Sequence, residues 1–461
     1  MFIAIIFFLA IIVCLVKPKY GVAMIFIFWL FFSNAYQSNL FVYDKLGSSP
    51  YSIIGISGLR LIDSEGIRIL IIVLFLSVLF RGIQNKLKEL WLLKIIGVIV
   101  FISVISIPIN DINLADGLSS LSIFLMSFLF LFSVLNIEFS EKYITNLLLI
   151  SFYFLIFNSF LQIYQFFFFA NGDVDMTMGL FSSTLQGPIV AYIVSFFFLG
   201  RLLIAKFDKY ILGAVFIAIV QLISSYLKGL IGFVLILLLA FKRFLFSGYK
   251  IAILSAVTFV IIVGISFYIF TDVVIDYSIF YAFLDTDNIT NAGPIKVWTQ
   301  YAENIQDAPQ NLIIGYGPSS YGSINTADQM GFGKSKLGKL LAISSYMSGR
   351  DFWGRALSTA GNILWEFGLI NLILFFYVYY SLYKRASFIF KETDQDLIRS
   401  YAFSVKYLII FVLFLYFIAI TGTTEEFFTW GHLFVVYSFI NSSAVENKPL
   451  QEYVPTVSEL T

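Results

Sequence analysis

The chain has 461 residues, of which 59% are hydrophobic and 12% charged, whereas soluble domains average about 45–50% and about 25%. Its 29 lysines and arginines nearly balance 28 aspartates and glutamates, so no basic excess is available to bind a nucleic acid. One cysteine and one histidine exclude a disulfide framework and the usual cysteine–histidine metal sites. These figures indicate a polytopic membrane protein.

The apolar runs predict an all-α polytopic integral membrane protein. A membrane-spanning helix needs about 20 mainly apolar residues, and only a helix satisfies its backbone groups within lipid. By that criterion we predict about 12–14 transmembrane helices. The predicted spans are 2–16, 21–40, 66–80, 91–109, 117–137, 144–169, 187–204, 209–226, 229–241, 249–270, 361–383, 402–420 and 427–441. The runs at 209–226 and 229–241 are short, and Lys228 interrupts them.

Charged residues alternate between the two sides of these spans. One side carries Lys17, Lys19, Arg81, Lys86, Lys88, Arg201, Lys206, Lys209, Lys242, Arg243, Lys250, Lys384, Arg385, Lys391 and Arg399. The other side carries Asp111, Asp116, Asp173, Asp175, Glu425 and Glu426. The positive-inside rule puts the first set in the cytoplasm, so we expect an outward N-terminus and a cytoplasmic tail at 446–461. The run at 2–16 lacks the basic region and cleavage site of a signal peptide, which predicts a retained helix.

Residues 1–461 form one predicted transmembrane domain with one large non-membrane segment. This segment is an outward-facing loop at 271–360, and loops of such length are usually functional. Two stretches in it, 296–305 and 334–343, have apolar residues at helical spacing. We expect each to lie against membrane lipids at the bilayer surface.

Several basic residues lie on the predicted outer side, against the general charge trend. Lys228 lies between two apolar runs, Lys296 begins the first amphipathic stretch, and Arg350 and Arg355 lie near the end of the loop. We interpret them as cations for the phosphates of a lipid-linked substrate. The alternatives are a lysine that extends to the membrane interface at position 228, and solvated or Asp351-paired arginines.

The sequence Gly315-Tyr316-Gly317-Pro318 predicts a tight turn. We expect its backbone NH groups to be available to an anion or a sugar hydroxyl. Tyr316 and Tyr321 are candidates to stack on sugar rings.

Acidic residues on the same side are candidates for a general base that activates an acceptor hydroxyl. They are Glu303, Glu366 and the pair Glu425 and Glu426, and the alternative for each is a helix cap or an ion pair. His432, at the start of the last span, is expected to be a packed and hydrogen-bonded residue rather than a catalyst.

Four segments, taken in order, resemble the O-antigen polymerase (Wzy-type) and O-antigen ligase superfamily of bacterial surface-polysaccharide enzymes. Met178–Tyr192 resembles a Gly-Leu-Phe segment that leads into a span, and Ser224–Phe233 resembles a Ser-Arg-Gly step between two spans. Lys296–Ile305 followed by Ile314–Tyr321 resembles the basic residue, helix and Gly-x-Gly turn of a large outer loop. Asn362–Ile370 resembles the segment that re-enters the membrane.

The resemblance implies a metal-independent glycosyltransferase of the all-helical GT-C type, without a cofactor, in the bacterial cytoplasmic (inner) membrane with an outward-facing active site. Its reaction would polymerise undecaprenyl-pyrophosphate-linked oligosaccharide repeat units into O-antigen, capsular polysaccharide or exopolysaccharide. A chain-length regulator is a further candidate partner. The implied catalytic residues are Lys228, Lys296, Arg350, Arg355, Glu303 and Glu366. The implied substrate-binding residues are Gly315, Tyr316, Gly317, Tyr321, Trp298 and Asn362.

Two departures from the family pattern bear on these roles. Lys228 stands where arginine is usual. The positive charge is therefore kept, and the bidentate hydrogen bonding of an arginine to phosphate is lost. The ligase branch carries a histidine before the re-entry segment, where this chain has Ala360 and Gly361. This difference favours a polymerase over a ligase.

Other classes stay open at this stage. A lipid-linked oligosaccharide flippase would place charges in a central cavity and would not need a long outer loop. A different glycosyltransferase would use acids of an early outer loop, for which Asp44, Asp63 and Glu65 are available. A channel or receptor would turn over no lipid-linked sugar.

Overall fold

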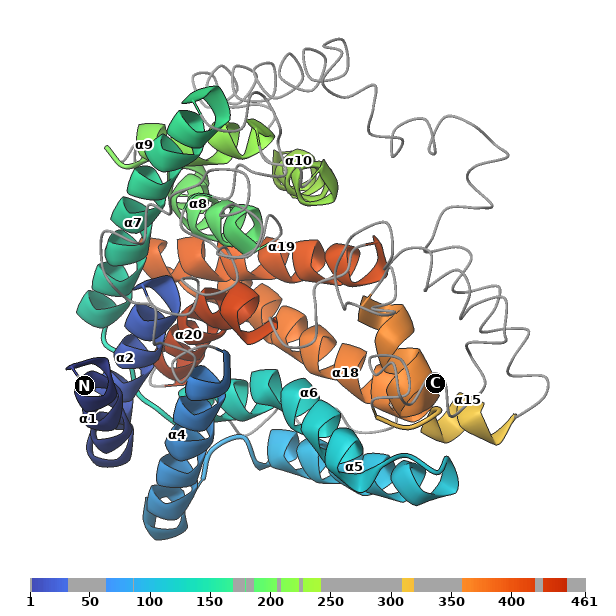
Figure 1. The fold of residues 1–461 in the computed structure, drawn as a ribbon. Coiled ribbons are helices and arrows are strands. Elements are labelled where there is room, and N and C mark those ends of the chain that lie inside the picture. Colours follow the sequence, from blue (N-terminus) through green and yellow to red (C-terminus); the bar gives the residue numbers. More distant parts are fainter. Residues whose placement is uncertain are drawn as a thin grey trace, which may run out of the picture.

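The computed structural model describes residues 2–31, 64–85, 87–168, 179, 186–204, 209–223, 227–241, 309–318, 359–418 and 426–445. All regular structure in these ranges is helical, which confirms the predicted all-α class for this part of the chain (Figure 1). Four helices in it are long and apolar enough to cross a membrane. The predicted span at 249–270, most of the loop at 271–360 and the tail at 446–461 lie outside the described residues.

The helices overlap the predicted spans, and α1, α5, α6, α7, α8 and α20 agree with them to within four residues at each end. Their bounds are α1 Phe2–Val16, α2 Pro18–Phe31, α4 Ser64–Asn85, α5 Leu90–Ile109, α6 Leu114–Leu135, α7 Glu141–Phe168, α8 Gln186–Ile204, α18 Thr359–Glu392, α19 Asp396–Ile418 and α20 Glu426–Val445. Of these, α5, α7, α18 and α19 are the four long apolar helices.

The region predicted as two spans at 209–226 and 229–241 is different. It contains α9 (Ile211–Val220), a single 3-10 turn η3 (Gln221–Ile223) and α10 (Leu227–Phe241). At 1.5 Å per residue α9 is about 15 Å long and α10 about 22 Å. Each is shorter than the roughly 30 Å of a bilayer's hydrocarbon core. The described part of this region is therefore two short apolar helices within the two predicted spans, and residues 224–226 between them lie outside the described residues.

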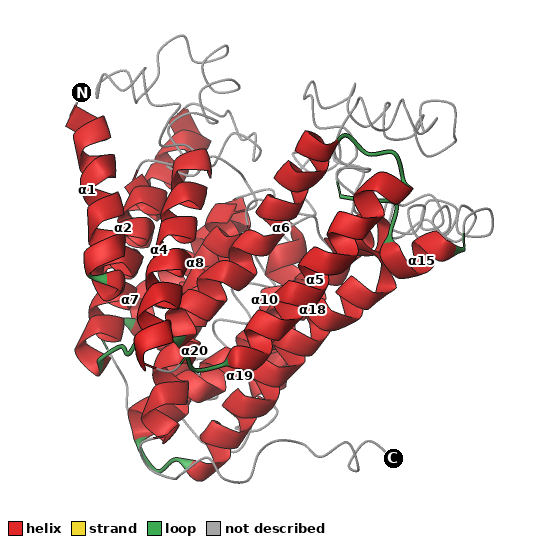
Figure 2. Ribbon diagram, turned by 90° about the horizontal axis from the view of Figure 1, so that it is seen from below, coloured by secondary structure: helices red, strands yellow, loops and turns green. Residues whose placement is uncertain are grey.

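Helices α8 and α20 lie at the centre of the bundle. Every side chain at 187–200 and at 430–440 is buried, as expected for helices that are apolar on all sides and surrounded by others. Helix α19 packs against α8, α10, α18 and α20 (Figures 1 and 2). Large aromatic side chains such as Trp365, Tyr401 and Trp430 fill this core.

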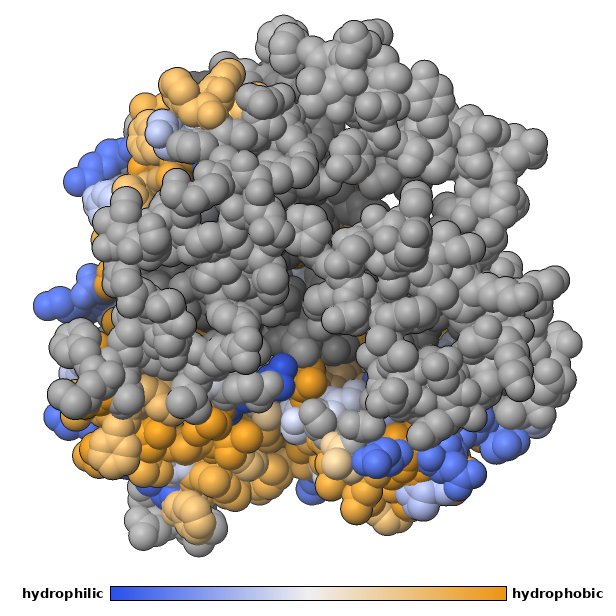
Figure 3. All heavy atoms as spheres, viewed as in Figure 1, coloured by the Kyte–Doolittle hydropathy of each residue, from blue (hydrophilic) through white to orange (hydrophobic). Residues whose placement is uncertain are grey.

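Outer helices expose apolar side chains on one side. On α4 and α5 these include Phe80 and Phe101, each 66% exposed. Figure 3 shows apolar surface over the side of the molecule formed by these helices. Contiguous apolar surface is unfavourable in water and favourable against lipid, which agrees with a membrane protein.

One end of the bundle gathers the basic residues that the charge pattern assigns to a single side, and we call it the basic end. Arg81 at the end of α4 donates to the Leu15 carbonyl oxygen at 3.0 Å. Tyr143 at the start of α7 donates to the Lys19 carbonyl oxygen at 2.9 Å. These contacts bring together the ends of α1 and α4 and the starts of α2 and α7 at one end of the bundle, as the alternation of charge predicts.

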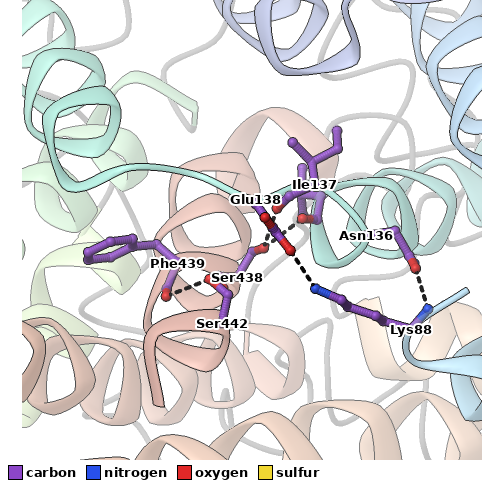
Figure 4. Close-up of polar contacts among 8 residues, drawn as sticks. Lys88, Asn136, Ile137, Glu138, Ser438, Phe439 and Ser442 are labelled. Carbon is purple, nitrogen blue, oxygen red and sulfur yellow. Dashed lines mark hydrogen bonds and ion pairs between the residues drawn. The ribbon is translucent and has the colours of Figure 1, made fainter. Parts of the chain in front are cut away.

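The loop between α6 and α7 makes hydrogen bonds and an ion pair with neighbouring segments at the basic end (Figure 4). The Lys88 ammonium pairs with the Glu138 carboxylate at 2.8 Å, and the Lys88 NH donates to Asn136 Oδ1 at 2.7 Å. Ser438 of α20 donates to the Val134 carbonyl oxygen at 2.6 Å. The loop therefore ties α5, α6 and α20 together at this end.

Candidate functional site

The candidate site lies at the opposite end of the bundle from the basic end. Here α5 ends, α6 and α18 begin, and the short helix α15 (Gln310–Ile314) packs against α18 and α5 (Figure 1). Helix α15 belongs to the predicted large loop, so this packing attaches that loop to the bundle. We call the contact the α15–α18 junction.

Two glycines form the centre of the junction. Gly315 ends α15 with φ 77° and ψ 174°, and Gly368 breaks α18 with φ 79° and ψ 175°. This backbone region is essentially restricted to glycine. A Cβ on Gly315 would lie 2.4 Å from the Glu366 carbonyl oxygen, and a Cβ on Gly368 would lie 2.3 Å from the Ile313 carbonyl oxygen. The two turns therefore pack backbone against backbone with no room for a side chain on either glycine.

Hydrogen bonds and stacking complete the junction. The Tyr316 NH donates to the Trp365 carbonyl oxygen at 2.8 Å, and the two rings stack with centroids 4.8 Å apart. The Gly315 carbonyl oxygen accepts from Asn110 Nδ2 at 3.2 Å and lies 3.4 Å from Ser106 Oγ. The turn is thus attached to α18 through Trp365 and to α5 through Asn110 and Ser106.

This geometry corrects two expectations about the Gly-x-Gly turn. The turn itself is confirmed, with positive φ at Gly315 and Gly317. The Gly315 NH donates to the Asn311 carbonyl oxygen and the Tyr316 NH to that of Trp365, so neither is available to an anion. The Tyr316 ring is 8% exposed and stacks on Trp365 rather than presenting a free face to a sugar. The cause is the break at Gly368, which brings the start of α18 against the turn.

Glu366 is the one predicted catalytic residue whose side chain the structure describes. It precedes Gly368 by two residues and is 9% exposed. Ser120 of α6 donates to its Oε2 at 3.0 Å. A carboxylate held in this way accepts hydrogen bonds only, and it can orient or deprotonate a hydroxyl that reaches it.

For two of the other predicted site residues, the structure describes only the backbone. Lys228 is the second residue of α10 and Asn362 lies in the first turn of α18, and the structure describes their backbone without their side chains. The remaining predicted residues lie outside the described part of the chain; they are Lys296, Trp298, Glu303, Tyr321, Arg350 and Arg355.

His432 is a packed residue, as expected. It is fully buried, its Nε2 lies 2.7 Å from Ser151 Oγ, and its ring centroid lies 4.6 Å from that of Phe26. Within the described ranges no three histidine, cysteine, aspartate or glutamate side chains lie together, so these residues offer no metal site.

The sequence analysis missed the polar residues that support the junction. Ser103, Ser106 and Asn110 lie on one face of α5, at the spacing that brings helical residues together. Ser103 lies 3.5 Å from the buried Asn371 amide of α18. Small polar residues repeated on one face of an otherwise apolar helix are a readable sign of helix–helix contact in membranes.

A second polar region joins α7 to η3, and we call it the carboxamide cluster: Asn158, Gln162 and Gln165 of α7 and Gln221 of η3. The Gln162 and Gln221 side chains exchange two hydrogen bonds, of 3.3 and 3.1 Å. Gln165 accepts from the Gly179 NH at 2.7 Å and donates to the Gly179 carbonyl oxygen at 3.2 Å. Helix α7 is therefore hydrogen-bonded both to Gly179 and to the turn η3.

Comparison with known proteins adds no family. No protein-family model matches the chain, and no curated protein is similar to it in sequence.

Proposed function

We propose that this protein is a glycosyltransferase that polymerises undecaprenyl-pyrophosphate-linked oligosaccharide repeat units on the outer face of a bacterial cytoplasmic membrane. The observation that carries the proposal is the α15–α18 junction. It joins two of the four segments that resemble the O-antigen polymerase superfamily, Ile314–Tyr321 and Asn362–Ile370, directly beside the buried carboxylate of Glu366. Of the other two segments, the one around Gly179 is hydrogen-bonded to Gln165 of α7, and the one at Ser224–Phe233 contains the start of α10.

In the proposed reaction Glu366 takes the proton of an acceptor sugar hydroxyl. The hydroxyl oxygen then forms a bond to the anomeric carbon of the donor, and the bond from that carbon to the lipid pyrophosphate breaks. Lys228 and Lys296, with Arg350 or Arg355, neutralise the charge that develops on the leaving pyrophosphate. Glu303 is the second candidate for the base.

The distribution of buried charge favours this reaction over transport. Among the side chains that the structure describes, Glu366 is the only buried carboxylate and no lysine or arginine is buried. A flippase for a charged pyrophosphate headgroup would need several ionisable groups along an internal path, because a charge is costly within a membrane. The single carboxylate at one end of the bundle suits chemistry at the surface better than passage through the bundle.

Reconstitution tests the proposal. Purified protein in liposomes is given lipid-pyrophosphate-linked repeat units from the encoding organism, and the products are separated on a gel. A ladder of increasing repeat number is expected, whereas units that cross the bilayer without elongation would establish a flippase instead. Glu366→Gln should abolish the ladder, because the amide keeps an acceptor for Ser120 and cannot take a proton. Glu138→Gln, at the basic end, is the matched control and should elongate normally.

A further inference from the structure

The basic end contains an arginine whose side chain is held in place and which the proposed reaction does not use. Arg385 of α18 donates from Nε to Asn441 Oδ1 of α20 at 3.0 Å, and its guanidinium lies 5.4 Å from the centroid of the Phe388 ring. In the part of the chain that the structure describes, neither Nη of this partly buried arginine has a hydrogen-bond acceptor. Two open Nη groups on a fixed guanidinium match the oxygens of a phosphate.

A chain of hydrogen bonds through α20 and the start of α5 fixes this arginine. Asn441 donates from Nδ2 to Glu89 Oε1 at 3.1 Å, and the Trp91 indole NH donates to Glu89 Oε2. Glu89 immediately precedes α5 and has left-handed backbone angles, φ 61° and ψ 41°, which are uncommon for a residue other than glycine. Its carboxylate makes no hydrogen bond that caps α5. The carboxylate therefore orients the asparagine and, through it, the arginine.

These contacts place the arginine at the edge of the membrane-spanning part of α18. Asn441 lies near the end of α20 and Glu89 lies just before α5, so Arg385 is level with two helix ends. From Gly368, at the other end of the bundle, it is about 17 residues or about 25 Å along the helix. This distance is close to the roughly 30 Å of hydrocarbon in a bilayer. A guanidinium at this level is within reach of lipid head groups.

The surface of α18 beside the arginine has the polarity of a phospholipid. Four residues spaced three or four apart share one side of the helix: Tyr377, Tyr380, Lys384 and Phe388. The two tyrosines are 48% and 57% exposed, and Lys384 is exposed. Arg385 reaches this side through its contact with Phe388. Exposed aromatic surface of the kind found at membrane interfaces thus leads to two cations at its outer edge.

Negative charges around the arginine favour an anion that arrives through the bilayer. The Glu89 carboxylate is separated from the guanidinium by one asparagine side chain. Farther along, the end of α18 and the start of α19 carry exposed Glu392, Asp394 and Asp396. A small anion in water would meet these carboxylates, whereas a lipid phosphate approaches along the side of α18 that carries the tyrosines.

We propose that Arg385 and Lys384 bind the phosphate of an anionic phospholipid in the leaflet at the basic end, and that Asn441 is a positioning residue for the guanidinium. The acyl chains lie along Tyr377 and Tyr380. This site is at the opposite end of the bundle from the α15–α18 junction and is independent of the proposed reaction.

Lipid binding to the purified protein in detergent tests the site. The probe is dioleoyl phosphatidylglycerol, with dioleoyl phosphatidylcholine as the zwitterionic control and inorganic phosphate as the soluble control. The dissociation constant is obtained from the rise in melting temperature with lipid concentration, relative to the same variant without lipid. Phosphatidylglycerol should raise the melting temperature, and the two controls should raise it much less.

Variants then separate a built site from a diffuse attraction to charge. Arg385→Gln should weaken phosphatidylglycerol binding about tenfold, and Lys384→Gln about threefold. Arg385→Lys should still lose about fivefold, because lysine keeps the charge without the bidentate geometry. Asn441→Leu removes no charge and should lose about threefold, since the guanidinium is no longer held. Arg399→Gln is the matched control and should bind normally; it removes another arginine at the same end, whose guanidinium lies 5.5 Å from the Phe390 ring centroid.

Each other result has a definite meaning. An equal loss in Arg385→Gln and Arg399→Gln overturns the site, because it shows attraction to net charge alone. Natural affinity in Arg385→Lys overturns the bidentate contact, and natural affinity in Asn441→Leu overturns the positioning role. Equal stabilisation by phosphatidylcholine or by inorganic phosphate overturns the assignment to an anionic lipid. If Asn441→Leu does not fold, Arg385→Lys compared with Arg399→Gln still decides whether the site exists.

Discussion

Regular α-helix is interrupted in two described places, at Gly368 of α18 and at the turn η3 that follows α9, and different contacts hold the two. At the α15–α18 junction, Gly315 and Gly368 pack backbone against backbone, and a Cβ on either would meet a main-chain oxygen. At η3, the side chains of Gln162 and Gln221 exchange hydrogen bonds. Main-chain atoms move little, whereas side chains can rotate. We therefore expect the first break to tolerate almost no substitution and the second to tolerate replacement of both partners together.

The largest effect is expected from Gly368→Ala. The substitution forces a Cβ to within 2.3 Å of the Ile313 carbonyl oxygen and places alanine in a backbone region suited to glycine. The free energy of unfolding should fall by about 3 kcal/mol or more, measured by denaturant titration in detergent. Gly97→Ala on α5 is the control, because no atom lies within 4 Å of the added Cβ, and it should be neutral or slightly stabilising. Equal stability of both variants would mean that the junction does not constrain the fold.

Ser120→Ala tests whether the first break serves catalysis as well as packing. Loss of the 3.0 Å hydrogen bond to Glu366 should lower kcat/KM for elongation about tenfold, with little change in melting temperature. Ser381→Ala is the control, because that hydroxyl bonds to the Tyr377 carbonyl oxygen within α18 and lies far along the helix from Glu366. An unchanged kcat/KM in Ser120→Ala would remove Ser120 from the site.

A smaller effect is expected from Gly179→Ala, which tests the side-chain-supported region. The added Cβ would meet the Asn158 carboxamide, at 2.2 Å from its Oδ1, and this side chain can move away. What remains is the cost of φ +65° for alanine, which is about 1–2 kcal/mol. The measurement is the same denaturant titration, and a loss as large as that of Gly368→Ala would contradict the contrast between the two regions.

The smallest effect is expected at the basic end, where the Lys88–Glu138 pair is exposed. The hydrogen bond and charge of Lys88 hold the pKa of Glu138 below its ordinary value. Because the folded pKa is the lower one, the pair contributes stability above the unfolded pKa of about 4.3, and this contribution is lost as pH falls through the folded pKa. Glu138→Gln should cost about 0.5 kcal/mol or less at pH 7 and less at pH 3 than at pH 7, compared by thermal unfolding at both pH values. A larger loss, or one insensitive to salt, would mean that the pair is shielded from solvent.

Much of the helical framework was predictable. The spans at 2–16 and 91–109 agree with α1 and α5 to within one residue, because a long apolar run has no other way to satisfy its backbone in lipid. The turn at Gly315–Pro318 was also predictable from its glycines and proline. The 3-10 turn at Gln221–Ile223 was not, because the predicted span at 209–226 continues through it. The use of the Tyr316 NH was hidden as well, because its acceptor, the Trp365 carbonyl oxygen, belongs to another part of the chain.

The sequence by itself determined an all-helical framework, a turn before Pro318 and a carboxylate at position 366 beside an outer loop. These features depend on local composition and on the bilayer, and both can be read along the chain. The tertiary structure decided that the turn of α15 packs on the break in α18, that Ser120 supports Glu366, and that Gln162 of α7 pairs with Gln221 of η3. These contacts join residues that are far apart in sequence, up to 246 positions for Ser120 and Glu366. Such pairings depend on how the helices pack, which no single segment specifies.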